Sequence, residues 1–153
     1  MALIGQTETE VGPLSGGCQC GAIRYSVSAG LTEPMICTCR MCQRATGNVL
    51  APFLAVDAER IRWTGSPTTY ASSSVAERGF CAACGTPLFY RKPGRASLAL
   101  MMGSIDGGAP SEPLSYYHPE TAPDWLHGLE AVPVKEHTLN GTQLLPRQTT
   151  QGK

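Results

Sequence analysis

The chain has 153 residues, a length typical of a single domain. Twelve lysines and arginines balance twelve aspartates and glutamates, so the formal net charge of zero argues against a nucleic-acid partner held by a basic surface. Hydrophobic residues make up 42% of the chain, too many for a disordered protein, and the apolar run at residues 98–102 is too short to cross a bilayer. We therefore expect no nucleic-acid or membrane partner. Because no secretory signal is visible at residues 1–10, we also expect a cytoplasmic location.

Short β-strands interrupted by glycine and proline dominate the pattern along the chain. Strands are predicted at residues 22–27, 49–56, 60–63, 68–70, 75–80, 87–91 and 97–102. Helix is scarce, with a turn or two expected at residues 39–44 and Gly47 as its stop. Residues 1–13 and 138–153 lack a hydrophobic period, so we expect flexible ends around one domain at residues 14–137. The pattern predicts a mainly β fold with a small antiparallel sheet or sandwich.

Seven cysteines fall into three groups with short internal spacing. The groups are a C-x-C motif, a C-x-C-x-x-C motif and a C-x-x-C motif, formed by Cys18 and Cys20, by Cys37, Cys39 and Cys42, and by Cys81 and Cys84. An odd number of cysteines without an export signal argues against a disulfide framework. Clustered thiolates are the ligands that zinc prefers, so we favour zinc over an iron–sulfur cluster or metal-free thiols.

The grouping of the seven cysteines divides them into a set of four and a set of three. The compact C-x-C-x-x-C motif can supply three corners of one tetrahedron and leave the fourth for water or substrate, as in catalytic zinc sites. We therefore predict that Cys37, Cys39 and Cys42 are catalytic. The remaining four, Cys18, Cys20, Cys81 and Cys84, would form a closed structural site, giving two zinc ions per chain.

With these motifs in view, the chain resembles the glutathione-dependent formaldehyde-activating enzyme family, which also contains centromere protein V. The resemblance covers residues 16–133 and is carried by GGCQCGA at 16–22, CTCRMCQRATG at 37–47, RGFCAACGTPL at 78–88, GSID at 103–106 and DWL at 124–126. It implies a β-tent of small folded-over antiparallel sheets built around zinc, with the same division of cysteines. It also implies addition of glutathione to formaldehyde, giving S-hydroxymethylglutathione. Many members carry His where this chain has Thr38.

The implied reaction makes the protein a carbon–sulfur lyase in which a zinc-held thiolate attacks a small carbonyl compound. Glutathione carries two carboxylates, so arginine partners are expected, and Arg40 and Arg44 beside Cys42 are the first candidates. Arg78, before the C-x-x-C motif, is a further candidate. Solvated arginines, or arginines that offset the charge of the zinc sites, are the alternative interpretation.

Other polar and aromatic residues have ordinary structural interpretations. Asp106 could be a general base, but a turn-forming aspartate beside two glycines is favoured. Tyr90 and Trp125 are expected in the core rather than in a pocket. The histidines lie outside every motif and are expected at the surface; they are His118, His127 and His137.

Two alternative functions remain open. The first is a zinc lyase that acts on another thiol adduct or small carbonyl through the same open site. The second is a non-enzymatic zinc-binding interaction module in which a partner supplies the fourth ligand. The sequence predicts a small-molecule substrate but no particular oligomeric state.

Overall fold

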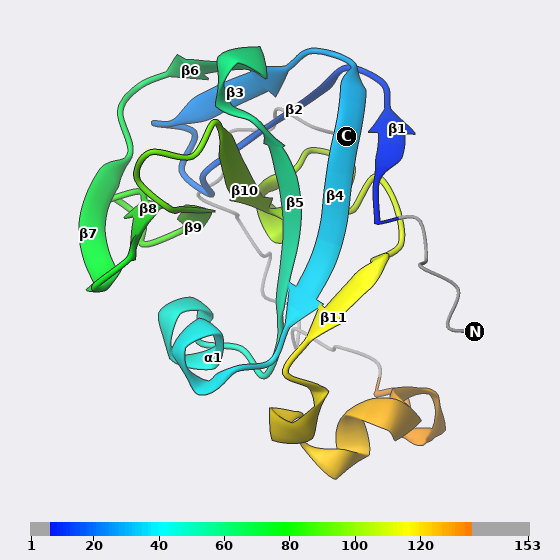
Figure 1. The fold of residues 1–153 in the computed structure, drawn as a ribbon. Coiled ribbons are helices and arrows are strands. Elements are labelled where there is room, and N and C mark those ends of the chain that lie inside the picture. Colours follow the sequence, from blue (N-terminus) through cyan, green and yellow to red (C-terminus); the bar gives the residue numbers. More distant parts are fainter. Residues whose placement is uncertain (1–6, 136–153) are drawn as a thin grey trace, which may run out of the picture.

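The structure, a computed structural model, describes residues 7–135 and consists mainly of strands in two sheets (Figure 1). The larger sheet has the order β1 (Thr9–Val11), β4 (Gly30–Cys37), β5 (Ala51–Asp57), β10 (Ser97–Met101), β9 (Pro87–Arg91), β8 (Ala76–Phe80) and β7 (Thr68–Ser73), and β11 (Ser115–Tyr117) pairs with β4. The smaller sheet has the order β2 (Leu14–Gly17), β3 (Arg24–Val27) and β6 (Ile61–Thr64). The predicted mainly β, antiparallel class is confirmed, with the parallel β4–β11 pair as an addition.

Helical structure is limited to short segments. The predicted helix is α1 (Arg40–Thr46), and it ends at Gly47, whose φ of 66° is the left-handed conformation that glycine adopts easily. The 3₁₀ segments are η1 (Ala58–Arg60), η2 (Met102–Ser104), η3 (Pro119–Thr121) and η4 (Asp124–Ala131). None of the helices formed by residues 7–135 has the length and apolarity that crossing a bilayer requires.

Alternation along β5 and β10 gives the larger sheet two different faces. Leu54 and Leu100 are fully buried on one face, where they pack with Tyr25, Val27 and Ile61 of the smaller sheet. The residues next to Leu54 and Leu100 on each strand point to the opposite face. There a second cluster forms around the C-x-C-x-x-C cysteines, and it includes Phe53, Ala99 and Met101. Because side chains alternate between the two faces, one face of these strands contributes to the main core and the other to the candidate site.

Strands β1, β2, β4 and β11 are absent from the sequence-based prediction. In β4, a proline and a glutamate interrupt the alternation that would have indicated a strand. The carbonyl of Pro34 accepts a hydrogen bond from the Leu114 backbone at 2.9 Å, on the side away from β5, so the N–H that proline lacks is not taken from the β4–β5 ladder.

Strand β1 falls within the segment that the sequence predicts to be a flexible end. Its residues pair with β4, and Val11 is buried. The domain limits at residues 14–137 stay a prediction, and the predicted tail at 138–153 lies outside the described residues.

Candidate metal centres and active site

Four cysteines from two distant segments meet where the smaller sheet approaches the β8–β9 hairpin. The Sγ atoms of Cys18, Cys20, Cys81 and Cys84 all lie within 4.8 Å of one another. The separation is 3.5 Å between Cys18 and Cys20, and 3.8 Å between Cys20 and Cys81. Zinc–sulfur bonds of about 2.3 Å in a tetrahedron give sulfur–sulfur edges of about 3.8 Å, so this cluster could hold a metal ion.

Tight turns and backbone hydrogen bonds build this four-cysteine cluster. Gly21 and Gly85, with φ of 79° and 78°, follow the two cysteine pairs and let the chain turn back over the sulfurs. The Ile23 backbone N–H donates to Cys18 Sγ at 3.3 Å. Burial acts to raise the pKa of Cys84, but hydrogen bonds from the side chain and backbone of Thr86 outweigh it, and the pKa falls to about 6. These hydrogen bonds therefore favour the thiolate form of Cys84. At Cys20, the Ala22 backbone acts to lower the pKa, but hydrogen bonds with the neighbouring sulfurs outweigh it and raise the pKa to about 11.

The other three cysteines form a second cluster at the lower end of β4, beside α1 (Figure 1). Cys37 is the last residue of β4, Cys39 is the N-cap of α1 and Cys42 lies in its first turn. The N-cap places Cys39 Sγ 3.4 Å from the Cys42 backbone N–H, which donates to it. The three sulfurs lie within 4.8 Å of one another, so this local segment could also hold a metal ion.

The three-cysteine cluster opens onto a cavity of about 490 Å³ on the second face of the larger sheet. Its floor comes from alternate residues of neighbouring strands, because β4, β5 and β10 pair Glu33, Ala55 and Ala99 across the sheet. Phe53, Met35 and Tyr90 complete the floor. The end of the cavity away from the cysteines, with Glu33, Lys92 and Arg95 in its lining, is called the charged end below. A small molecule bound there would have three sulfurs at one end.

Arg78 of β8 contacts the three-cysteine cluster directly. Its side chain is 6% exposed, and Nη2 donates a hydrogen bond to Cys42 Sγ at 3.3 Å. Burial raises the pKa of Cys42, and the hydrogen bond from Arg78 acts in the opposite direction. Burial also raises the pKa of Cys37 to about 12. The guanidinium therefore favours the anionic form of a sulfur that its surroundings would otherwise keep neutral.

Thr38, between the first two cysteines of the C-x-C-x-x-C motif, joins the β11–η3 segment to the cluster through hydrogen bonds. It is fully buried, its hydroxyl donates to the His118 carbonyl, and its backbone N–H donates to Tyr117 at 3.1 Å. Gln43 of α1 reinforces the same junction by donating to the Thr38 carbonyl at 2.8 Å. These contacts bring His118 to the wall of the cavity, a position that its place outside every motif did not indicate.

The predicted glutathione partners Arg40 and Arg44 lie apart from the cavity lining. Both are exposed, and Arg40 donates to Gln43 on its own helix. The cavity is lined instead by Lys92 and Arg95, from the β9–β10 turn. No pattern near the cysteines in the sequence predicts that Lys92 and Arg95 line the cavity, because the pairing of strands far apart in the chain brings these two residues to the site.

The other candidate residues have structural positions or lie elsewhere. Asp106 accepts hydrogen bonds from Arg24 and Ser15, and the Arg24 guanidinium lowers the pKa of its carboxyl. Tyr90 lines the cavity and Trp125 is 55% exposed. The sequence-based expectation that both residues lie in the core rather than in a pocket is therefore wrong. His127 is exposed as predicted, and His137 is outside the described residues.

Comparisons with known proteins agree with the motifs. A family model described as glutathione-dependent formaldehyde-activating enzyme matches residues 13–122. A Halomonas elongata protein that carries this family's name as a provisional assignment is 32% identical over 124 residues, covering 74% of this chain and 79% of the relative. An uncharacterized lyase of Schizosaccharomyces pombe is 34% identical over 77 residues, covering 49% of this chain and 55% of the relative. A Rhodobacter sphaeroides crystal structure shares the fold, with a TM-score of 0.51 and 20% identity over 67% of this chain and 98% of that one.

Proposed function

Because the chain belongs to the glutathione-dependent formaldehyde-activating enzyme family, we propose that it is a zinc-dependent carbon–sulfur lyase that adds glutathione, or another thiol, to formaldehyde. The product would be S-hydroxymethylglutathione. The observation that carries the proposal is the position of Cys37, Cys39 and Cys42 at one end of a cavity of about 490 Å³. The four-cysteine cluster lines none of the cavities described for residues 7–135, which supports a structural role for it.

The donor sets support zinc as the metal at both clusters. Thiolates are soft ligands, and sets of three or four cysteines at these separations suit a tetrahedral ion. Four ligands complete a tetrahedron, whereas three leave one position for a substrate. When bound at the three-cysteine cluster, zinc would supply the positive charge that keeps a neighbouring thiol deprotonated and nucleophilic.

The charged end of the cavity supports a zwitterionic thiol peptide as the substrate. Lys92 and Arg95 could bind a carboxylate and Glu33 an ammonium group. Among the residues that the structure describes, none of these three takes part in an ion pair. Glu33 and Cys37 are four residues apart on β4, or about 13 Å, and an extended tripeptide spans about 10 Å. An extended tripeptide bound along β4 would therefore cover most of the distance between the cysteines and Glu33.

The addition needs a nucleophilic sulfur and one proton transfer. The thiol loses its proton, its sulfur forms a bond to the carbonyl carbon, and the π electron pair of the carbonyl moves to oxygen, which then takes up a proton. His118 lines the cavity, and an imidazole can give or take such a proton. Its Nδ1 lies 3.1 Å from Glu120 Oε1, a contact that orients the ring. The apolar floor, including Phe53 and Ala99, limits water around the reacting atoms.

The direct test is the Cys42→Ser variant. We expect turnover to fall to the uncatalysed rate and zinc content to fall by about one ion per chain, with folding retained. NMR exchange measurements on ¹³C-formaldehyde and glutathione would give the rate, and elemental analysis the zinc content. The four-cysteine cluster serves as the internal control for metal loading. Catalysis at the wild-type rate in Cys42→Ser would refute the proposed site.

A second experiment, in which cyanide or a thiol is added to the metal-loaded protein, separates the alternative functions. A lyase acting on a different thiol adduct would bind thiols at one of its two ions but fail to accelerate the reaction of glutathione with formaldehyde. A non-enzymatic interaction module would have no exchangeable metal position, so neither cyanide nor a thiol would perturb either ion. Cobalt substitution followed by absorption spectroscopy would distinguish these outcomes.

A further inference from the structure

Arg78 is a buried cation that forms no ion pair with any carboxylate of the described residues. Arginines are seldom buried unless they are paired. Within residues 7–135, no ion pair includes Arg78, and its hydrogen bond goes to Cys42 Sγ at 3.3 Å. Its guanidinium carbon also lies 5.0 Å from the centroid of the Tyr90 ring, directly across the β8–β9 pair. The position is therefore built around one sulfur and one aromatic face.

One further hydrogen-bond donor of Arg78 is left without a partner. Its Nε is buried and has no hydrogen-bond partner among the described residues. A buried arginine that serves only packing would be expected to saturate its donors or to be replaced by an apolar residue. A buried charge with an unpartnered donor indicates a role that depends on the charge itself.

Charge neutralisation supplies that role. Three thiolates and one divalent cation together leave one negative charge at the three-cysteine cluster, and Arg78 contributes one positive charge beside it. Because the arginine is almost fully buried, solvent screens the interaction weakly. Strand β8 leads directly into Cys81 of the other cluster, so one short strand serves both metal centres.

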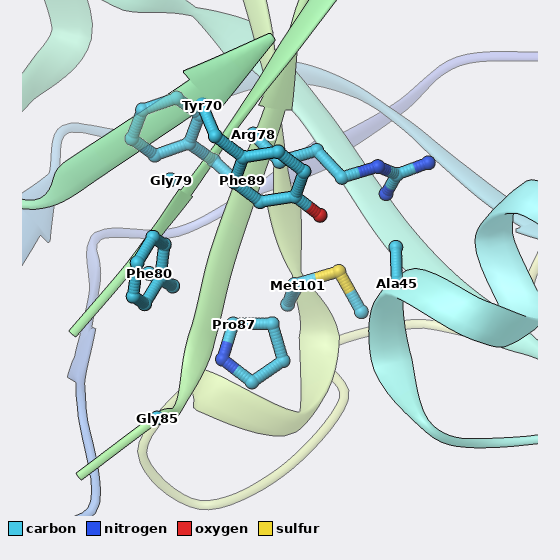
Figure 2. Close-up of a pocket in the computed structure, with 9 residues that line it drawn as sticks. All are labelled: Ala45, Tyr70, Arg78, Gly79, Phe80, Gly85, Pro87, Phe89 and Met101. Carbon is cyan, nitrogen blue, oxygen red and sulfur yellow. The ribbon is translucent and has the colours of Figure 1, made fainter. Parts of the chain in front are cut away.

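Arg78 is also a wall between two cavities. Figure 2 shows the residues that line a second cavity, and Arg78 is one of them; the volume of this cavity is about 310 Å³. Aromatic and apolar side chains line most of it, including Tyr70, Phe80 and Phe89. Of the residues that the structure describes, Arg78 alone lines both this cavity and the one beside the cysteines. A short side chain here would join the two cavities and open the rear of the cluster to water.

We infer that Arg78 is the positioning residue of the three-cysteine metal site. Its Nη2 fixes the Cys42 sulfur, its charge offsets the excess thiolate charge, and its side chain closes the rear of the site. The inference rests on the proposed metal role of the cluster. Groups that hold metal ligands in this way typically contribute 10–100-fold to metal affinity, so a change of this size is the expected effect.

The test compares Arg78→Met and Arg78→Lys with the wild type, all loaded with cobalt. Arg62→Met is the matched control, because Arg62 is exposed on β6 and donates to the Glu59 carbonyl, away from both clusters. Chelator competition gives the affinity of each ion, and the thiolate-to-cobalt absorption bands report the geometry. We expect Arg78→Met to lower the affinity of one ion 10–100-fold and to shift its bands, with the other ion unchanged. Arg78→Lys should be intermediate and Arg62→Met unchanged.

The possible results separate this inference from the proposed function. Wild-type protein that binds only one ion, and keeps that ion in Cys42→Ser, refutes the metal role of the three-cysteine cluster. Two ions in the wild type, with unchanged affinities and spectra in Arg78→Met, overturn the inference about Arg78 alone. If Arg78→Met does not fold, Arg78→Lys decides, because it retains the charge and most of the stem. Equal weakening of both ions in Arg78→Lys would indicate a general structural role and would also overturn the inference.

Discussion

Replacement of both Cys20 and Cys84 by alanine should destabilise the whole domain, whereas replacement of Cys42 should not. The four-cysteine cluster joins Cys20 to Cys81, 61 residues apart in the sequence, with their sulfurs 3.8 Å apart. A cross-link that closes a loop of this length stabilises a folded chain by about 4 kcal/mol in the chain-entropy estimate. Domains are stable by only about 5–15 kcal/mol, so loss of this link is a large fraction of the total. Cys37, Cys39 and Cys42 belong to one local segment and close no long loop.

Thermal unfolding followed by circular dichroism measures this difference. A loss of about 4 kcal/mol corresponds to a fall in Tm on the order of 10–15 °C for a chain of this size. We expect that fall in the double variant Cys20→Ala and Cys84→Ala, in which only two cysteines of the cluster remain, together with loss of one zinc ion per chain by elemental analysis. Cys42→Ala should also lose one ion but keep its Tm within a few degrees of the wild type. Equal transitions in the two variants would refute the assignment of the four-cysteine cluster as the structural link.

Two further predictions address the substrate end of the cavity and the packing beneath it. The double replacement Lys92→Met and Arg95→Met should raise KM for glutathione at least tenfold and leave KM for the neutral thiol 2-mercaptoethanol within twofold. The reason is that only glutathione presents a carboxylate to the two cations. Steady-state kinetics measures both constants, and equal changes for the two thiols would contradict the prediction. Gly79→Ala should lower the free energy of unfolding by about 1–3 kcal/mol in urea titrations, since its Cβ would lie 2.1 Å from the Phe89 ring, which packs against Trp63. Gly103→Ala is the control, with nothing within 4 Å of its Cβ, and an equal loss in both variants would exclude the clash as the cause.

The local features of this protein were predictable from its sequence. The spacing of the cysteines predicted one set of three and one set of four, and the structure brings together the same sets. The helix at α1 and its stop at Gly47 followed from turn chemistry, and alternation predicted the strands on both sides of the main core. These features depend on neighbours a few residues apart, and the chain itself fixes those distances.

The charges of the site were harder to predict. Arg40 and Arg44 adjoin Cys42 in the sequence, but both are exposed and lie outside the cavity lining. Lys92 and Arg95 reach the cavity because β9 and β10 pair beside β5, and Thr38 brings His118 there through its contact with β11. Strand pairing and buried hydrogen bonds set these positions, and no local pattern records them.

The sequence by itself therefore determined which sulfurs can act together, because cysteine spacing limits the geometry of a tetrahedral site. Only the tertiary structure decided which cluster opens onto a cavity, which cations face it and which arginine is buried against Cys42. Those properties depend on the register between strands that lie far apart in the chain, since a shift of one residue would turn each side chain to the opposite face of the sheet.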